Sequence, residues 1–229
     1  MALRYLFLAL LVLISACGKQ VANTLVFGRG GDSVGLDPAL ETDGESFKVC
    51  DNIYETLITF KAESTELAPG LAESWSASED GLTWTFQLRR GVTFHDGTAF
   101  DAQAVVFSLV RQFKSDHPFH KVEGAYQYWN SMSMSDIVKD VRAVDDFIVA
   151  IDLKRPNAPF LSNLAMGFCG IVSPDGVKKW GGDFARHPVG TGPFRFVEWI
   201  KDDRIVLEKY AQYWGTVSKL DRLIFRSIP

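Results

Sequence analysis

The sequence predicts an α/β protein with mixed sheets, and three observations lead to that prediction. Residues 83–88 alternate polar with apolar side chains, as expected of a strand with one buried face. Residues 102–113 instead repeat apolar side chains at helical spacing. The 229 residues are 47% hydrophobic and 23% charged, a composition typical of a globular chain that can bury a sizeable core.

The first 17 residues predict a lipoprotein signal peptide. Arg4 supplies a positive charge, and the apolar run of residues 6–14 is too short to span a bilayer but suits a signal sequence. Small residues then precede Cys17, which resembles a bacterial lipobox. We therefore expect Cys17 to carry a lipid that anchors the exported chain to a membrane. The alternative is an ordinary signal peptide that ends near a cysteine.

Residues 24–28 predict the first strand, and a glycine-rich segment follows it. A dinucleotide-binding loop is not expected here, because the G-x-G-x-x-G spacing is absent and Pro38 interrupts the helix that should follow. Residues 45–54 predict a helix with a core face that includes Phe47 and Cys50. Export would permit a disulfide between Cys50 and Cys169, and two buried free thiols are the alternative.

The chain is organised around residues 70–97, which predict an antiparallel hairpin and one further strand. Trp75 falls in the first strand, and Glu79-Asp80-Gly81 forms the turn, since glycine accepts a positive φ. Residues 83–88 form the second strand, with Trp84, Phe86 and Leu88 on one face. Residues 92–95 predict a third short strand.

Asp101 predicts the start of the helix over residues 102–113, because its carboxylate can accept the first free backbone N–H groups. His117 and His120 are spaced as metal ligands on a helix would be. Pro118 lies between them and no third ligand is near, so no metal site is predicted. Tyr126 and Trp129 offer flat rings for contact with a solute, and a packed surface loop is the alternative.

The second half of the chain predicts short elements joined by turns. The expected elements are a hairpin of residues 137–144 and 147–153, a helix from Pro159 to Met166, a strand at 171–173, a helix at 174–179, a hairpin of 194–200 and 204–209, and a last strand at 219–228.

Three of these segments resemble one family, the extracellular solute-binding proteins that serve peptide ABC transporters (family 5). The longest match is GLAESW followed by S-x-DG-x-TW-x-F-x-LR-x-GV-x-FHDG, within residues 70–97. The second is L-x-R-P-x-A-P-F-L at residues 153–161, and the third is GTGPF at residues 190–194. The fixed spacing of the turns over such a length makes accidental agreement improbable.

The resemblance implies the first lobe of a type II periplasmic-binding-protein-like fold, with the second lobe absent. Residues 18–44 and 187–229 would form the lobe, and residues 45–186 a small inserted α+β domain. In the family the segment around Asp37-Pro38 borders the ligand cleft. The expected ligand-binding residues are Ser33, Val34, Gly35, Leu36, Asp37, Thr42, Asp43, Gly44, Tyr126 and Trp129, although a plain connecting loop remains the alternative for 33–44.

The implied function is capture of short, dipeptide-like peptides in the periplasm or at the cell surface, for an ABC permease in the inner membrane. The same fold with haem, glutathione or another small solute is one alternative, and an exported enzyme or inactive fragment is another. No cofactor is expected, and no G-x-S-x-G, H-E-x-x-H, P-loop or C-x-x-C motif indicates an enzyme. A net charge of −4 without a basic run argues against nucleic acid.

The family holds its peptides partly through an acidic residue and an arginine of the second lobe, at positions beyond Pro229. We therefore expect this chain alone to bind peptide weakly or not at all. Nanomolar binding by residues 18–229 would contradict that expectation.

Overall fold

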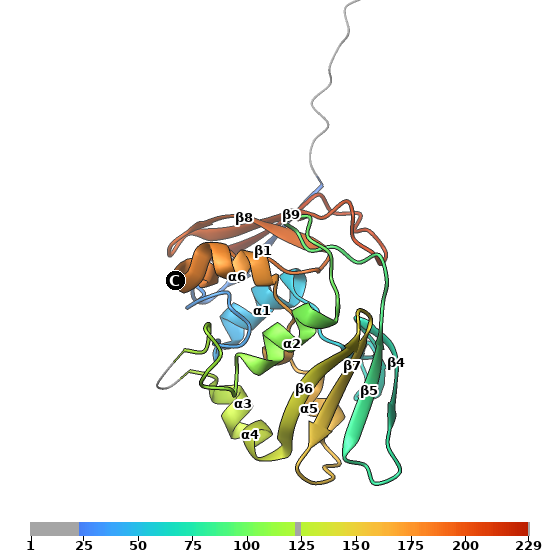
Figure 1. Ribbon diagram of the computed structural model, residues 1–229. Coiled ribbons are helices and arrows are strands. Elements are labelled where there is room, and N and C mark those ends of the chain that lie inside the picture. The colour runs from blue at the N-terminus through green and yellow to red at the C-terminus, as the bar shows by residue number, and fades with distance from the viewer. Residues whose placement is uncertain (1–22, 122–124, 229) are drawn as a thin grey trace, which may run out of the picture.

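The computed structural model describes residues 23–121 and 125–228, and it contains two four-stranded sheets with helices between them (Figure 1). Cys17 and the rest of the predicted signal peptide lie outside the described residues. The strands are β1 (Thr24–Arg29), β2 (Ile58–Phe60), β3 (Leu67–Pro69), β4 (Ala72–Ala77), β5 (Thr83–Leu88), β6 (Val138–Asp145), β7 (Ile148–Leu153), β8 (Phe194–Ile200), β9 (Arg204–Lys209) and β10 (Arg222–Ser227).

The described helices are short, and most connect or cover the sheets. The α-helices are α1 (Gly44–Ile53), α2 (Ala102–Val110), α3 (Gln127–Ser131), α4 (Met134–Ile137), α5 (Phe160–Leu164) and α6 (Pro174–Trp180). Two 3-10 helices, η1 (Gly167–Cys169) and η2 (Gly181–Arg186), flank α6 in the chain.

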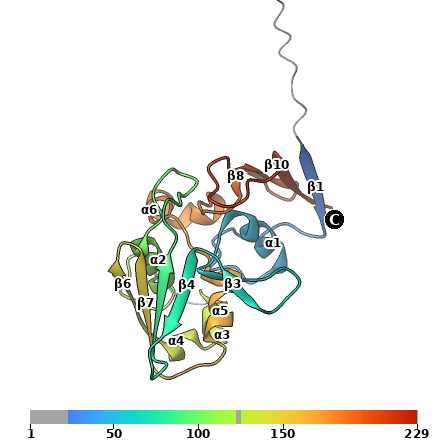
Figure 2. The ribbon, with the colours of Figure 1, turned by 90° about the vertical axis from the view of Figure 1, so that its right-hand side faces the viewer.

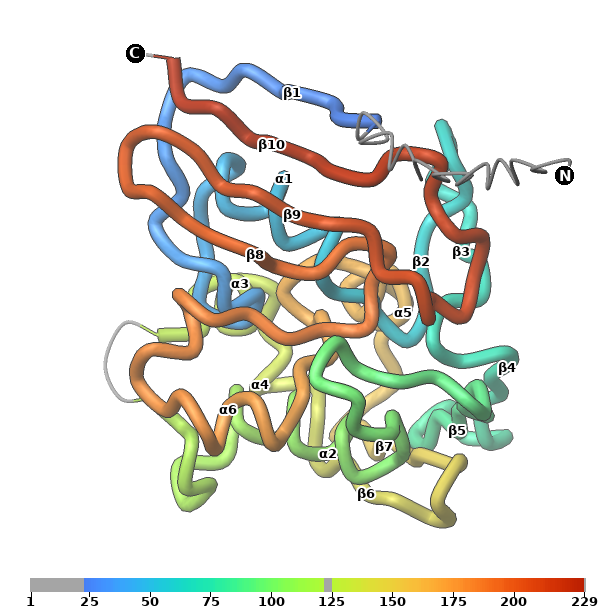
Figure 3. The backbone as a smooth tube through the Cα atoms, turned by 90° about the horizontal axis from the view of Figure 1, so that it is seen from above, coloured from blue at the N-terminus to red at the C-terminus, as the bar shows by residue number. Residues whose placement is uncertain are grey.

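The first sheet combines strands from the two ends of the described chain in the order β1-β10-β9-β8. The pair β1–β10 is parallel, with Phe27 opposite Phe225, and the other pairs are antiparallel, so this sheet is mixed as predicted. Figure 3 shows β1 running beside β10 at the edge of this sheet.

The second sheet has the order β4-β5-β7-β6 and is antiparallel throughout. The predicted hairpin of residues 70–97 supplies β4 and β5, with Trp75 opposite Phe86. Phe86 and Leu88 are buried, while Trp84 is half-buried, so the predicted apolar face is present.

Each sheet packs against its own helix, which gives the molecule two hydrophobic cores (Figures 1 and 2). Val49 and Ile53 of α1 pack with Phe194 and Ile205 of the first sheet. Helix α2 instead packs on β6 and β7 of the second sheet. The division into residues 18–44 with 187–229 and an inserted 45–186 stays a prediction, and we note that α1 shares a core with the first sheet.

Two predicted strands are absent, and in both places the backbone forms other hydrogen bonds. Residues 92–94 instead lead into a tight turn, closed by the Gly97 N–H bonding to the Phe94 carbonyl, and only one isolated bridge forms across it, between Thr93 and Ala99. Residues 171–173 bond to two different segments, since the Ile171 N–H donates to Glu55 and the Ser173 N–H to Val189. Neither segment therefore has a continuous partner strand.

Candidate functional site

Helix α1 connects the predicted ligand loop to a cavity of the described chain. Asp43 caps the helix, because its Oδ1 accepts the Ser46 N–H at 2.8 Å. Gly44, Phe47 and Asp51 then recur on one side of the helix at spacings of three and four residues. This side is open, whereas Val49 on the other side is buried. Phe47, predicted as a core residue, is only half-buried as a result.

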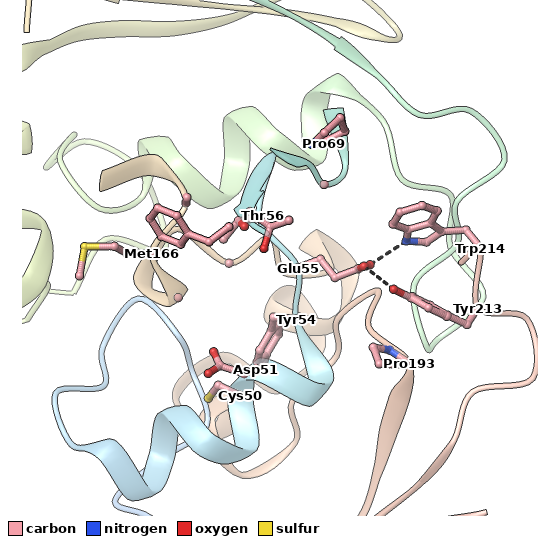
Figure 4. A pocket seen from close by; sticks show the side chains of 16 residues that line it. Cys50, Asp51, Tyr54, Glu55, Thr56, Pro69, Met166, Pro193, Tyr213 and Trp214 are labelled. Atoms are coloured by element: carbon pink, nitrogen blue, oxygen red, sulfur yellow. Dashed lines mark hydrogen bonds between the residues drawn. The ribbon is translucent and has the colours of Figure 1, made fainter. Parts of the chain in front are cut away.

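A cavity of about 710 Å³ lies beside the C-terminal end of α1 (Figure 4). The end of α1, strands β2 and β3, residues 165–170, Pro193, Tyr213 and Trp214 line it. Its walls combine aromatic and aliphatic side chains with a few polar groups. This is the usual composition of a small-molecule site.

Glu55 holds in place the wall of this cavity that Tyr213 and Trp214 form. Its carboxylate accepts hydrogen bonds from the Tyr213 hydroxyl at 2.8 Å and the Trp214 indole N–H at 2.8 Å, as Figure 4 shows. The Thr191 hydroxyl donates a third at 2.9 Å. Burial raises the pKa of Glu55, while the three donors act in the opposite direction. The Arg89 guanidinium, 4.3 Å from the Trp214 ring centroid, packs on the indole.

A second cavity of about 150 Å³ adjoins the first along α1. The Phe47 and Tyr128 rings, which meet edge to face at 5.5 Å, line it together with Phe168. Asp51, Met166 and Gly167 line both cavities. We call the two cavities together the α1 groove.

Gly167 lies where the two cavities meet, and its lack of a side chain leaves space there. A Cβ at this position would lie 3.0 Å from the Phe47 ring and 3.2 Å from Asp51 Oδ1. Any side chain there would have to displace these neighbours. The glycine therefore keeps the junction of the groove open.

Of the predicted ligand residues, Val34, Thr42 and Gly44 are exposed, and Val34 is 75% exposed. Gly44 lies on the open side of α1, but none of the three lines a cavity. Ser33 is buried, and its hydroxyl accepts from Arg29 at 2.7 Å and donates to the Glu45 carbonyl. The ligand role of these residues stays a prediction.

Asp37 is buried in an ion pair that holds the predicted loop to the end of α2. Arg111 donates to both carboxylate oxygens, at 2.6 and 2.8 Å, and both side chains are 3% exposed. Gly35 and Leu36 are buried beside it. The nearby Glu41 accepts the Asp37 N–H at 3.2 Å, and burial raises the pKa of Glu41 to about 7. This part of the loop is fixed by internal contacts.

Tyr126 and Trp129, predicted to contact the solute, pack into the core of the second sheet. Trp129 is 1% exposed and stacks on Phe113 at 5.4 Å, and the Tyr126 hydroxyl accepts the Lys121 N–H at 3.0 Å. Tyr128 lines the groove instead. One residue along a helix turns the side chain by about 100°, so the helical spacing around Trp129 could have identified Tyr128.

The sequence reasoning missed Asp51, Glu55 and Met166 as groove residues. Asp51 lies on the open side of the predicted helix, but that helix was interpreted for its apolar face, and Glu55 follows the helix end, where helical spacing gives no signal.

The remaining sequence candidates have structural partners. His117 Nδ1 accepts the Phe119 N–H, and His120 Nδ1 bonds to the Arg111 carbonyl. Within residues 23–121 and 125–228, no three His, Cys, Asp or Glu side chains are placed to hold a metal ion. Cys50 and Cys169 are buried free thiols, which answers the disulfide question. No helix in these ranges has the length and apolar character needed to cross a membrane.

Comparison with known proteins identifies the family. Residues 66–229 match the family described as bacterial extracellular solute-binding proteins, family 5 Middle. The chain belongs to this family. Among curated members of family 5, the dipeptide-binding protein of Escherichia coli K12 is 40% identical over 96% of this chain and 43% of its own length. Heme-binding protein A of Haemophilus influenzae is 39% identical over 90% of this chain and 40% of its own length.

Solved structures of family 5 members share the fold. The periplasmic binding protein DppA from Helicobacter pylori, in complex with the peptide STSA, superposes with a TM-score of 0.85 at 44% identity. The match covers 90% of this chain and 43% of the neighbour. The fold is therefore that of a type II periplasmic binding protein, of which this chain spans one lobe. These relatives are solute-binding proteins rather than enzymes.

Proposed function

We propose that this chain is the first lobe of a solute-binding protein that captures short, dipeptide-like peptides for an ABC transporter. The observation that supports this best is the 40% identity to the Escherichia coli dipeptide-binding protein across 96% of the chain. The Helicobacter pylori neighbour, which holds a four-residue peptide, is 44% identical.

The α1 groove is the proposed solute site. Its larger cavity, about 710 Å³, falls within the range of about 300–1,000 Å³ usual for small-molecule sites. The bonds of Glu55 to Tyr213 and Trp214 hold one wall in place before a solute arrives, which lowers the entropic cost of binding. The exposed Val34, Thr42 and Gly44 remain proposed contacts beyond the N-terminal end of α1.

A membrane anchor and a second lobe would complete the protein for delivery of the solute to the permease. A lipid on Cys17 would hold the protein at a membrane, in the periplasm or at the cell surface. A second lobe would close over the groove and exclude water from the solute. The permease would recognise this closed state.

Haem is the second candidate solute, because Heme-binding protein A of Haemophilus influenzae is 39% identical. The aromatic rings of the smaller cavity could contact a planar macrocycle. A glutathione-binding relative is 36% identical, and glutathione is itself a short peptide. Peptide remains the first candidate, because it agrees with both the curated relative and the solved neighbour.

The test is a titration of purified residues 18–229 with a dipeptide pool and, separately, with haem. Calorimetry gives the affinity, and NMR chemical shifts locate the contact. We expect weak, saturable peptide binding that shifts the signals of Asp51, Gly167 and Trp214, since one lobe makes only part of the contacts. Dipeptide-induced shifts confined to residues outside the groove contradict the groove as the solute site, and a haem absorbance change at stoichiometric amounts supports the second candidate.

A further inference from the structure

We propose that the open edge of β1, the side away from β10, pairs with the same strand of a second copy of this chain. Two four-stranded sheets would then join into one continuous sheet. Among the described strands β10 is the only neighbour of β1, so β1 forms an edge of the first sheet (Figure 3). No residue of β1 lines the α1 groove, and the inference does not rest on the proposed function.

β1 exposes apolar side chains on both faces of the sheet. Leu25, Val26 and Phe27 are 48%, 55% and 45% exposed. Because side chains alternate across a strand, Leu25 and Phe27 share one face and Val26 lies on the other. Ile228 is also exposed and lies against Gly28, where its Cδ1 would be 2.8 Å from an added Cβ. A flat protein surface would cover only one of these faces, whereas an added strand covers both.

The backbone of β1 directs hydrogen-bonding groups toward the open edge. The Asn23 and Arg29 carbonyls accept hydrogen bonds from the side of the sheet where β10 lies. Successive residues of a strand direct their N–H and C=O groups alternately to its two sides. The groups of Val26 and Gly28 therefore point to the open edge. Such a row of backbone groups is a template for a further strand.

The other three edge strands of the two four-stranded sheets carry features that prevent such pairing. β4, β6 and β8 each contain a register shift and charged side chains, both of which discourage a further strand. The charged residues are Glu73 in β4, Lys139, Asp140, Arg142 and Asp145 in β6, and Arg195 and Glu198 in β8. The pairing of β1 has no register shift, and its one charged residue, Arg29, is 4% exposed and paired with Asp32. Of the four edges, that of β1 is the unprotected one.

The edge of β1 is complementary to itself. Two copies of β1 can pair antiparallel about a two-fold axis at Val26, which places the outward backbone groups of Val26 opposite those of Val26 in the second copy. Leu25 then lies opposite Phe27 of the second copy, at a position without hydrogen bonds, where opposed side chains approach most closely. The cation beside this pair, Lys48 at 6.0 Å from the Phe27 ring, is already neutralised by Glu45. Pairing therefore buries apolar side chains and no unpaired charge.

The dimer should be weak, because one pair of six-residue strands is a small interface. A standard interface buries about 800 Å² per partner. Three half-exposed side chains of β1 and Ile228 supply less than this. We therefore expect a dissociation constant on the order of 10–100 µM.

The experiment is sedimentation velocity on purified residues 18–229 between about 1 and about 500 µM, a range that brackets the expected dissociation constant. The variant is Val26→Lys, which places two like charges opposite each other at the two-fold axis. The matched control is Val144→Lys, because Val144 is also a valine of an edge strand, β6, and is 54% exposed against 55% for Val26. Circular dichroism checks that each variant is folded.

We expect the parent to pass from monomer to dimer as its concentration rises, without larger species, because pairing uses up the open edge of both copies. Val26→Lys should weaken the dimer at least about tenfold, and Val144→Lys should not. A parent that stays monomeric would leave the edge to a strand of a different polypeptide and overturns the inference. Larger aggregates in place of a dimer, or equal dimerisation of the parent and Val26→Lys, also overturn it.

A second variant, Val26→Cys, tests the register without adding a charge. Directly opposed residues in a hydrogen-bonded antiparallel pair have Cα atoms about 5.5 Å apart, within the usual reach of a disulfide. With diamide to accept the two hydrogens, the two opposed thiols should join into a covalent dimer. Val144→Cys should stay monomeric, and Cys50 and Cys169 are buried. A covalent yield of Val26→Cys no higher than that of Val144→Cys overturns the proposed pairing.

Discussion

Replacing Glu41 with glutamine should make the protein more stable at alkaline pH. Glu41 is 5% exposed and accepts the Asp37 N–H in the loop that leads to α1. Burial raises the pKa of Glu41 from 4.5 to about 7. The folded state therefore keeps this carboxyl protonated at a pH where the unfolded chain has already released the proton.

The direction and size of the stability change follow from the difference between the pKa of Glu41 in the folded and the unfolded chain. The shift is about 7 − 4.5 = 2.5 units, and each unit corresponds to about 1.4 kcal/mol, which gives about 3 kcal/mol. The stabilising contribution is complete below about pH 4.5 and is lost as the pH rises through about 7. Glu41→Gln cannot ionise and keeps an oxygen for the Asp37 N–H. We expect it to be about 2–3 kcal/mol more stable than the parent at pH 8, and within about 1 kcal/mol at pH 4.5.

Urea unfolding followed by tryptophan fluorescence at pH 4.5, 6 and 8 measures this difference. Comparing the variant with its parent at each pH removes the contributions of other carboxyl groups, including Asp51 and Glu55, whose pKa values burial also raises. A Glu41→Gln variant that is less stable at pH 8, or a difference that does not change with pH, would refute the reasoning.

Three further substitutions test the loop and the groove. Arg111→Ala should cost about 3–5 kcal/mol in urea unfolding by leaving a buried carboxylate unpaired, whereas Arg142→Ala, from a half-exposed pair, should cost less than about 1 kcal/mol. Glu55→Ala should cost about 1–3 kcal/mol and shift the NMR signal of the Trp214 indole N–H, and an unshifted signal would contradict the assigned bond. Gly167→Ala should weaken dipeptide binding in the groove while the chain stays folded, because the added Cβ would crowd the Phe47 ring and Asp51, and unchanged binding would contradict this role of the glycine.

The regular elements of this fold could be predicted from local sequence patterns. The hairpin of β4 and β5, the cap at Asp101 and the hairpin of β8 and β9 depend on turn residues and periodicity, which neighbouring residues determine. Residues 92–95 were predicted wrongly as a strand, because their hydrogen bonds go partly to residues 98–100 across a tight turn and partly to Gly190. A strand requires a partner, and sequence alternation cannot show whether the partner exists.

The groove was harder to predict because it is assembled by distant contacts. Tyr128 and Trp129 are adjacent, and only packing decides which ring enters the core and which faces the groove. Asp37 was predicted as a ligand residue because its segment borders the cleft in the family, and its pairing with Arg111, 74 residues later, could not be predicted. Partners at such separations leave no local pattern in the sequence.

The parallel pairing of β1 with β10 has a consequence for the order in which the protein folds. The Asn23 N–H bonds to the Asp221 side chain across a separation of 198 residues, beside the start of both strands. Closing so long a segment costs conformational entropy before any contact offsets it, which is why such topologies fold slowly. During synthesis the hairpin of β4 and β5 can form early, whereas β1 has no partner until the last described strand is complete. Throughout that interval Leu25, Val26 and Phe27, which stay about half exposed even in the finished sheet, form an apolar segment that a chaperone can bind.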